Sequence, residues 1–159
     1  MAFARARLIR ALGAWMNLIK LLNFELESSY YALTIKGLGY DWDLHNFADY
    51  QGFCFDPTDN SLSLMWIAVP NEGNPWGCPA NKSKGCKLIF RNIRFLQMSG
   101  MDESIPLSEE LGLSSISKVI PNTTEWRCKE TWDETDEFNL LFEFQSERSL
   151  EIGAESVEL

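Results

Sequence analysis

The stretch HNFADYQGFCFD, residues 45–56, holds the only histidine of the chain, two aspartates, a cysteine and four aromatic residues. A histidine paired with a carboxylate is a common acid–base unit of enzymes, and His45 has three aspartates within four positions. The stretch lacks the Gly-x-Ser-x-Gly turn of serine hydrolases, and no neighbouring basic residue would activate Cys54. We therefore predict that residues 44–50 form a polar turn into a strand, and that the chain is not an enzyme.

The cysteines give no metal-binding pattern. Cys78 and Cys86 are separated by the seven residues PANKSKG, which matches none of the compact zinc spacings, and one histidine cannot complete a Cys₂His₂ site. We predict no metal and no cofactor. Two alternatives stay open for the thiols: they are free, or Cys78 and Cys86 form a disulfide in an oxidising compartment.

Tryptophan is frequent, with six residues, and exposed aromatic rings are a common platform for sugars. Trp76 lies in the Gly/Pro/Asn-rich stretch of residues 70–85, which predicts a long exposed loop. Together with His45 and Asp49, it is our candidate ligand platform. A carbohydrate-binding domain that uses Trp76 and Trp132 is the alternative function.

A strongly acidic segment surrounds Trp132. An aromatic side chain within a cluster of acids can anchor a basic partner while the charges steer its approach. We therefore predict a partner-binding site, the acidic block, formed by Glu130, Trp132, Asp133, Glu134, Asp136 and Glu137.

Net charge excludes one class of partner. The 159 residues include 23 acidic and 14 basic side chains, a formal net charge of −9. Such a chain repels phosphate backbones, so we predict no binding of nucleic acid and expect a basic protein partner. No apolar run reaches the roughly 18 residues that a membrane span requires, so we also predict no integral membrane segment.

Residues 1–24 carry four basic and no acidic side chains. Their helical periodicity predicts a basic amphipathic helix that covers one end of the domain. Its apolar arc contains Leu8, Leu12, Trp15, Met16, Ile19 and Leu22. A membrane-surface helix, a transit peptide and an extension upstream of a start at Met16 are the alternatives. Because Asn17 and Lys20 interrupt the apolar core that a secretory signal needs, we expect a cytoplasmic protein.

From residue 25 to 159 the pattern predicts a single β-rich domain. Residues 50–56 and 61–69 alternate around the turn PTDN and predict a hairpin. In FNLLFEFQ the residues Phe138, Leu140, Phe142 and Phe144 share one face, and in SLEIGAESVEL Glu151 and Glu155 lie opposite the apolar face. Residues 105–112, IPLSEELG, predict a short helical turn ended by Gly112. About eight strands favour an antiparallel β-sandwich or a half-open barrel.

Three features resemble small bacterial β-sandwich immunity proteins of polymorphic toxin systems and related uncharacterised families. They are HNFAD before the hairpin, LIFRNIRFLQM with its Ile93 and Phe95 pair, and the terminal LLFEFQSERSLEIGAESVEL. The resemblance covers residues 30–159 approximately, and Asn46 stands where the family usually has aspartate. It implies a binding protein that occludes a toxin without catalysis or cofactor.

We therefore expect a non-catalytic protein-binding domain, in its most specific form an immunity-type inhibitor that occludes a basic toxin or nuclease. Under this hypothesis the acidic block makes the contact with the partner.

Overall fold

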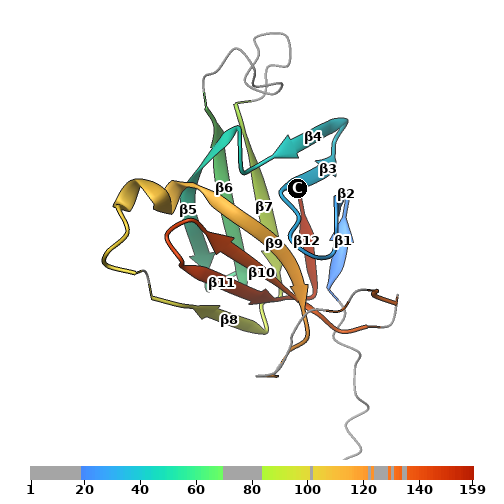
Figure 1. Ribbon diagram of the computed structural model, residues 1–159. Coiled ribbons are helices and arrows are strands. Elements are labelled where there is room, and N and C mark those ends of the chain that lie inside the picture. Colours follow the sequence, from blue (N-terminus) through green and yellow to red (C-terminus); the bar gives the residue numbers. More distant parts are fainter. Residues whose placement is uncertain are drawn as a thin grey trace, which may run out of the picture.

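The computed structural model describes residues 19–69, 84–100, 102–121, 123, 129, 131–133 and 136–159 (Figure 1). Its strands are β1 (Lys20–Leu22), β2 (Phe24–Leu26), β3 (Thr34–Gly37), β4 (Tyr40–Asp43), β5 (Ala48–Asp56), β6 (Ser61–Ala68), β7 (Gly85–Arg91), β8 (Phe95–Met98), β9 (Leu113–Val119), β10 (Asn139–Phe144), β11 (Ser149–Gly153) and β12 (Ser156–Glu158). A short 3₁₀ helix, η1 (Leu107–Leu111), precedes β9. The prediction of a mainly β chain is confirmed, although the described strands outnumber the eight expected.

The strands form three sheets, none of which closes on itself. The largest has the order β1–β12–β7–β6–β5, and its neighbours are antiparallel except for β1 and β12, which run parallel. In Figure 1 its longest strands, β5, β6 and β7, lie side by side. The C-terminal strand β12 therefore lies inside the sheet, between β1 and β7.

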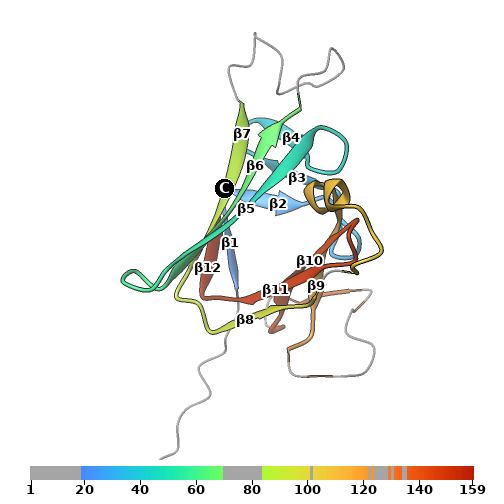
Figure 2. The ribbon, with the colours of Figure 1, turned by 90° about the vertical axis from the view of Figure 1, so that its left-hand side faces the viewer.

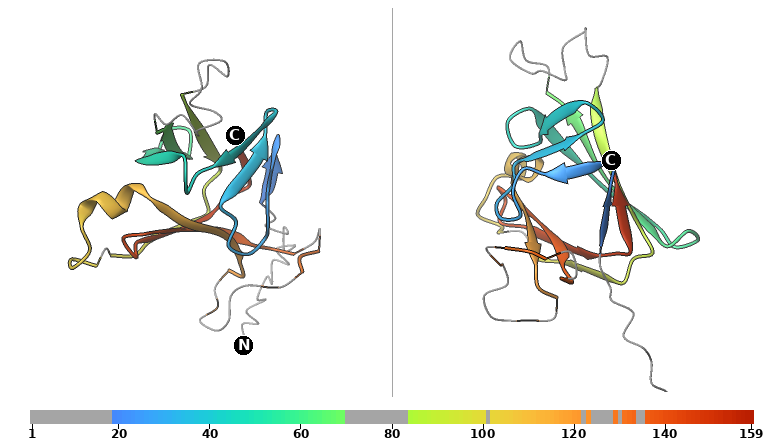
Figure 3. Two further views of the ribbon diagram at one scale, coloured as in Figure 1. Left: turned by 45° about the horizontal axis from the view of Figure 1, so that its top comes forward. Right: turned by 90° about the vertical axis from the view of Figure 1, so that its right-hand side faces the viewer.

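The two smaller sheets are antiparallel, with the orders β8–β11–β10–β9 and β2–β3–β4. A bridge between Ala32 and Ile116 connects the segment before β3 to β9. Figure 3 shows the three sheets on different sides of the molecule. Their apolar faces meet in one core.

Large side chains join the two bigger sheets across this core. Leu62, Leu64 and Trp66 of β6 are fully buried on one face, as the alternation of residues 61–69 predicts. The ring centroids of Trp66 and Phe142 lie 6.1 Å apart. The ring of Phe90 packs edge-on against that of Phe142, and their centroids are also 6.1 Å apart. Because burying one such side chain contributes about 1.5–3 kcal/mol, these contacts are a main source of stability.

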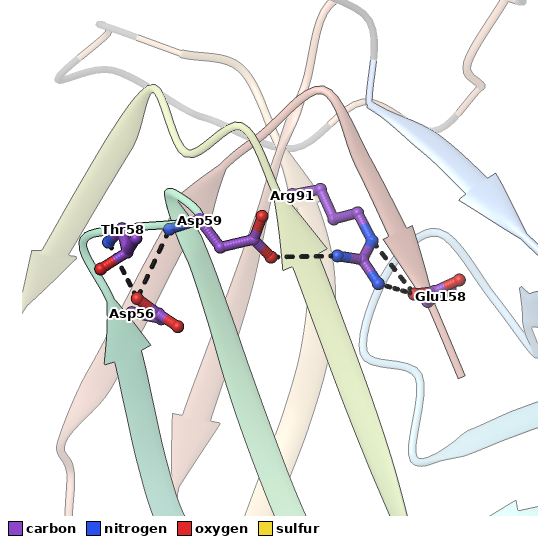
Figure 4. A network of polar contacts seen from close by, with 5 residues as sticks. All are labelled: Asp56, Thr58, Asp59, Arg91 and Glu158. Carbon is purple, nitrogen blue, oxygen red and sulfur yellow. Dashed lines mark hydrogen bonds and ion pairs between the residues drawn. The ribbon is translucent and has the colours of Figure 1, made fainter.

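The predicted β5–β6 hairpin is confirmed. Oδ1 of Asp56 accepts the backbone N–H groups of Thr58 at 2.8 Å and Asp59 at 3.4 Å, which fixes the turn (Figure 4). Asn60 completes the turn with a φ of 46°, a left-handed conformation that asparagine adopts more readily than most residues. Asn60 belongs to the predicted PTDN, whereas Asp56, which accepts both hydrogen bonds, is the last residue of β5 before it.

Arg91, at the end of β7, connects this hairpin to the C-terminal strand (Figure 4). Its Nη1 lies 3.3 Å from Oδ2 of Asp59, and its Nη2 lies 2.7 Å from Oε1 of Glu158. The three side chains are partly exposed, so each pair contributes only about 0–1 kcal/mol. The network therefore aligns the ends of neighbouring elements more than it stabilises the fold.

The short helical turn predicted for residues 105–112 is confirmed as η1. Pro106 precedes its first residue, and the backbone carbonyl of Pro106 accepts the N–H of Glu109 at 3.0 Å. Gly112 follows its last residue and returns to extended geometry. Only Gly112 therefore separates η1 from the first residue of β9.

The helix predicted for residues 1–24 is wrong for residues 20–24, because β1 and the start of β2 are extended. Residues 1–18 lie outside the described part of the chain. β1 pairs with β12, and this pairing supplies backbone hydrogen bonds from a distant strand. Tertiary pairing thus overrides the helical periodicity of this short segment.

Glu151 also departs from expectation. Its side chain lies on the other face of β11 from Leu150 and Ile152, as the alternation predicts. This face is expected to be solvated, but the side chain of Glu151 is buried. Oε1 of Glu151 accepts a hydrogen bond from Nδ2 of the buried Asn139 at 2.7 Å. The outer face of this sheet is therefore closed to solvent at this point.

Candidate binding groove

The structure places His45 in a turn between β4 and β5, as predicted. The carboxylate of Asp43 accepts the backbone N–H of His45 at 3.2 Å. The half-buried ring has its Nδ1 2.5 Å from the carbonyl oxygen of Leu113, so a backbone group satisfies this ring nitrogen. Asp49 lies in β5, and Trp76 lies outside the described residues. Their role with His45 as a ligand platform stays a prediction.

The acidic block is partly described. Trp132, Asp133, Asp136 and Glu137 are among the described residues, whereas Glu130 and Glu134 are not. Oδ1 of Asp136 lies 2.6 Å from Nζ of Lys129, and Oδ2 accepts the backbone N–H of Asp133 at 2.9 Å. The hydrogen bond from Lys129, followed by that from Asp133, holds the pKa of Asp136 below its usual range. Part of the charge of the block is thus balanced within the chain.

Trp132 is half-buried and packs against the core. Its ring meets Phe138 edge-on with centroids 5.6 Å apart, and Nζ of Lys129 lies 5.3 Å from its centroid. These contacts attach the segment around Trp132 to the core. The contact of Trp132 with a partner protein or with a sugar stays a prediction.

A band of exposed apolar side chains, which sequence reasoning missed, lies where β5 and β8 form the edges of their sheets. We name it the β5–β8 band; it consists of Phe53 and Phe55 in β5, Leu96 and Met98 in β8, and Leu111 in η1. Each of these side chains is 40–50% exposed. Figure 2 looks onto this side, with β5 above, β8 below and η1 to the right.

The four strand residues of the band belong to the inner faces of the two sheets. Each is directly opposite a buried residue of the neighbouring strand: Phe53 is opposite Leu64, for example, and Met98 is opposite Leu150. Directly paired residues share a face of the sheet. The band stays exposed because no further strand among the described residues covers this side.

A bulge in β5 preserves this register. The pairing with β6 shifts between Tyr50 and Gly52, so that Tyr50 is opposite Trp66 while Phe53 is opposite Leu64. Gly52 has a φ of +110°, a backbone conformation that residues other than glycine rarely adopt. The bulge therefore keeps both Tyr50 and Phe53 on the inner face.

The band lies beside two unpaired strand edges. Among the described strands, β5 pairs only with β6, and β8 pairs only with β11. Alternate backbone N–H and C=O groups along their outer sides therefore have no ladder partner. This combination of apolar side chains and available backbone groups is a surface that an extended chain can use.

A pocket of about 340 Å³ lies at the η1 end of the band. Its apolar walls come from Phe53, Met98, Leu111, Phe144 and Leu150, and its polar side chains are those of Tyr50, Gln51, Glu110 and Arg148. Glu110 and Arg148 form an ion pair. Burial raises the pKa of Tyr50 well above its usual range, so the hydroxyl stays protonated. We name this site the Tyr50 pocket.

The sequence contains one signal for this site. The alternation FCF predicts that Phe53 and Phe55 share a face, and the pairing confirms it. Alternation does not reveal that this face continues past the edge of the opposite sheet. The polar residues of the pocket come from β5, η1 and the turn before β11, segments whose proximity no local pattern indicates.

Among the described residues, no group of three or more histidine, cysteine, aspartate or glutamate side chains is placed to hold a metal ion. No helix in the described part of the chain has the length and apolar character needed to cross a membrane. Comparisons with models of protein families, with curated proteins and with solved structures found no match. The chemistry of the band and of its pocket is therefore the basis for a functional assignment.

Proposed function

We propose that the chain is a non-catalytic protein-binding domain that accepts an extended, apolar segment of a partner along the β5–β8 band. One observation carries the proposal: five apolar side chains stay exposed beside two strand edges that have no partner among the described strands. An extended segment can pair with such an edge through its backbone. Its alternate side chains would then lie on the apolar inner face.

The edge itself supports this proposal. An exposed apolar edge strand invites association, and natural proteins usually protect such edges with charges, prolines or a covering element. β5 has a bulge and an acid near each end, but Phe53, Cys54 and Phe55 are all exposed in its second half. A partner segment that covers these residues would remove their apolar surface from water.

Charge indicates the kind of partner. With a formal net charge of −9, the chain attracts a basic protein and repels an acidic one. An immunity-type inhibitor that occludes a basic toxin is the most specific form of the proposal. In that form the acidic block would steer the approach, while the band would supply the apolar contact.

A capture experiment with matched variants tests the proposal. The full chain is immobilised and exposed to lysate of its source cell, and retained proteins are identified by mass spectrometry. The double variant Phe55→Gln/Leu96→Gln changes the band. The control Met65→Gln/Ile67→Gln changes two side chains that are each 46% exposed on the outward face of β6.

We expect a basic protein that the parent chain and the control retain and that the band variant loses. Backbone amides of β5 should also exchange more slowly with solvent in the complex, because a paired edge is protected. Equal retention by the band variant and the control would contradict the proposal. Loss only when Asp133 and Glu137 are replaced by lysine would instead place the interface at the acidic block.

A further inference from the structure

We propose that the Tyr50 pocket binds a small apolar molecule that carries an uncharged carbonyl group. The pocket shares Phe53, Met98 and Leu111 with the β5–β8 band, but its polar side chains lie outside the band, and they carry the inference. Its volume of about 340 Å³ lies within the range of pockets that hold small organic ligands. Its walls supply apolar surface, and two buried donors define the chemistry of the ligand.

Tyr50 supplies the first donor. Its side chain is 8% exposed, and its ring centroid lies 4.6 Å from that of Phe144 and 5.3 Å from that of Trp66. These contacts fix the position of the hydroxyl. No group among the described residues accepts a hydrogen bond from Oη of Tyr50, and a buried hydroxyl without an acceptor is unfavourable. A ligand oxygen would satisfy it.

Arg148 supplies the second donor and excludes a charged ligand. Its Nη1 is paired with Oε1 of Glu110, whereas its buried Nε has no acceptor among the described residues. Because Glu110 already balances the guanidinium charge, a ligand carboxylate would bring an uncompensated negative charge into the pocket. A carbonyl oxygen accepts hydrogen bonds without that penalty.

Access to the donors requires a small rearrangement. Oη of Tyr50 is buried, so a ligand reaches it only by displacing side chains at the rim of the pocket. Met98 is an exposed member of this rim, and its long unbranched side chain adapts readily to a new neighbour. The pocket therefore accommodates a ligand by rotamer changes without altering the sheets.

Three probes of similar shape test the ligand class. 2-Acetylnaphthalene presents a neutral carbonyl, 2-ethylnaphthalene presents no acceptor, and 2-naphthoate presents a charged one. Each is titrated into the isotope-labelled full chain and followed by nuclear magnetic resonance. We expect shifts centred on residues 51–53 and 110–111, with the ketone binding about 3- to 10-fold more tightly than the hydrocarbon, and more tightly than naphthoate.

The variant Tyr50→Phe isolates the hydroxyl. This variant should bind the ketone only as tightly as the hydrocarbon, and its affinity for the hydrocarbon should be unchanged. Its melting temperature should not fall, because the substitution removes a hydroxyl that has no acceptor among the described residues. The control Phe55→Gln/Leu96→Gln should leave ketone binding unchanged, since neither residue lines the pocket. Loss of partner capture in that variant with intact ketone binding would separate the two proposals.

Two results would overturn the inference. One is a parent chain that binds the ketone no more tightly than the hydrocarbon, a comparison that requires no variant. The other is a Tyr50→Phe chain that keeps the ketone preference.

Discussion

The two described cysteines show how the surroundings change the same side chain. Cys86 is buried in β7 opposite Trp66, and this burial raises the pKa of its thiol to about 12. Cys54 is exposed in β5. The thiol of Cys86 is therefore protonated and protected at neutral pH, which is the behaviour of a structural residue.

This difference predicts a pH dependence of stability. An unfolded thiol ionises near pH 9.0, whereas Cys86 in the folded chain ionises near pH 12. Between these values the unfolded state binds fewer protons than the folded state, so the free energy of unfolding falls as pH rises. We expect a contribution from Cys86 of about 1.4 kcal/mol for each pH unit well above pH 9.

Urea unfolding of the parent chain and of Cys86→Val measures this effect. The other ionisable groups are common to both chains, so the change with pH in their stability difference isolates Cys86. The parent chain should lose stability relative to the variant between about pH 8 and about pH 10.5. A constant difference over that interval would mean that Cys86 titrates in the folded chain as it does in the unfolded chain.

At the scale of an element, the turn between β3 and β4 combines favourable and unfavourable residues. Leu38 and Gly39 both have positive φ, at 55° and 82°, as a tight hairpin turn with two left-handed residues requires. Glycine adopts this conformation without cost, but leucine does not. Leu38 is also exposed, so no burial compensates for the strain.

Replacing Leu38 with asparagine should therefore stabilise the chain. Asn-Gly is the preferred pair for such a turn, and we expect the free energy of unfolding to rise by about 0.5–1 kcal/mol. The matched variant Leu38→Val should be less stable than the parent, because β-branched residues tolerate positive φ poorly. Thermal unfolding of the three chains measures their order of stability. A Leu38→Asn chain that is no more stable than the Leu38→Val chain would refute the expected order.

At the scale of the whole molecule, the end of the chain is an internal part of the largest sheet. β12 lies between β1 and β7, and Val157 is fully buried. In the described chain, β1 has no other strand partner. The last residues therefore connect the first and middle parts of the chain, which makes the fold depend on contacts of very long sequence separation.

Deletion of residues 156–159 should abolish cooperative thermal unfolding. It removes the strand partner of β1, uncovers one edge of β7 and opens the core at Val157. The control Glu158→Gln removes only the partly exposed pair with Arg91 and should change stability by less than about 1 kcal/mol. Circular dichroism melting measures both; a truncated chain that still melts cooperatively near the parent temperature would contradict this account.

Several features follow from the sequence alone. The alternation in β6 and β10 determines which side chains are inward, residues 56–60 determine the turn between β5 and β6, and Pro106 and Gly112 delimit η1. Each of these depends on neighbouring residues only. Backbone geometry of period two and the chemistry of turn residues are local properties, so the amino-acid sequence specifies them directly.

Other features exist only in the tertiary structure. Residues 20–22 become a strand because β12 offers an edge, and Glu151 is buried beside Asn139 of the neighbouring strand. The β5–β8 band stays exposed because the order of strands makes β5 and β8 edges. The Tyr50 pocket brings together residues of β5, β8, η1, β10, β11 and the turn before β11. Strand order and sheet edges arise from pairings between remote residues, and no periodicity within a segment encodes them.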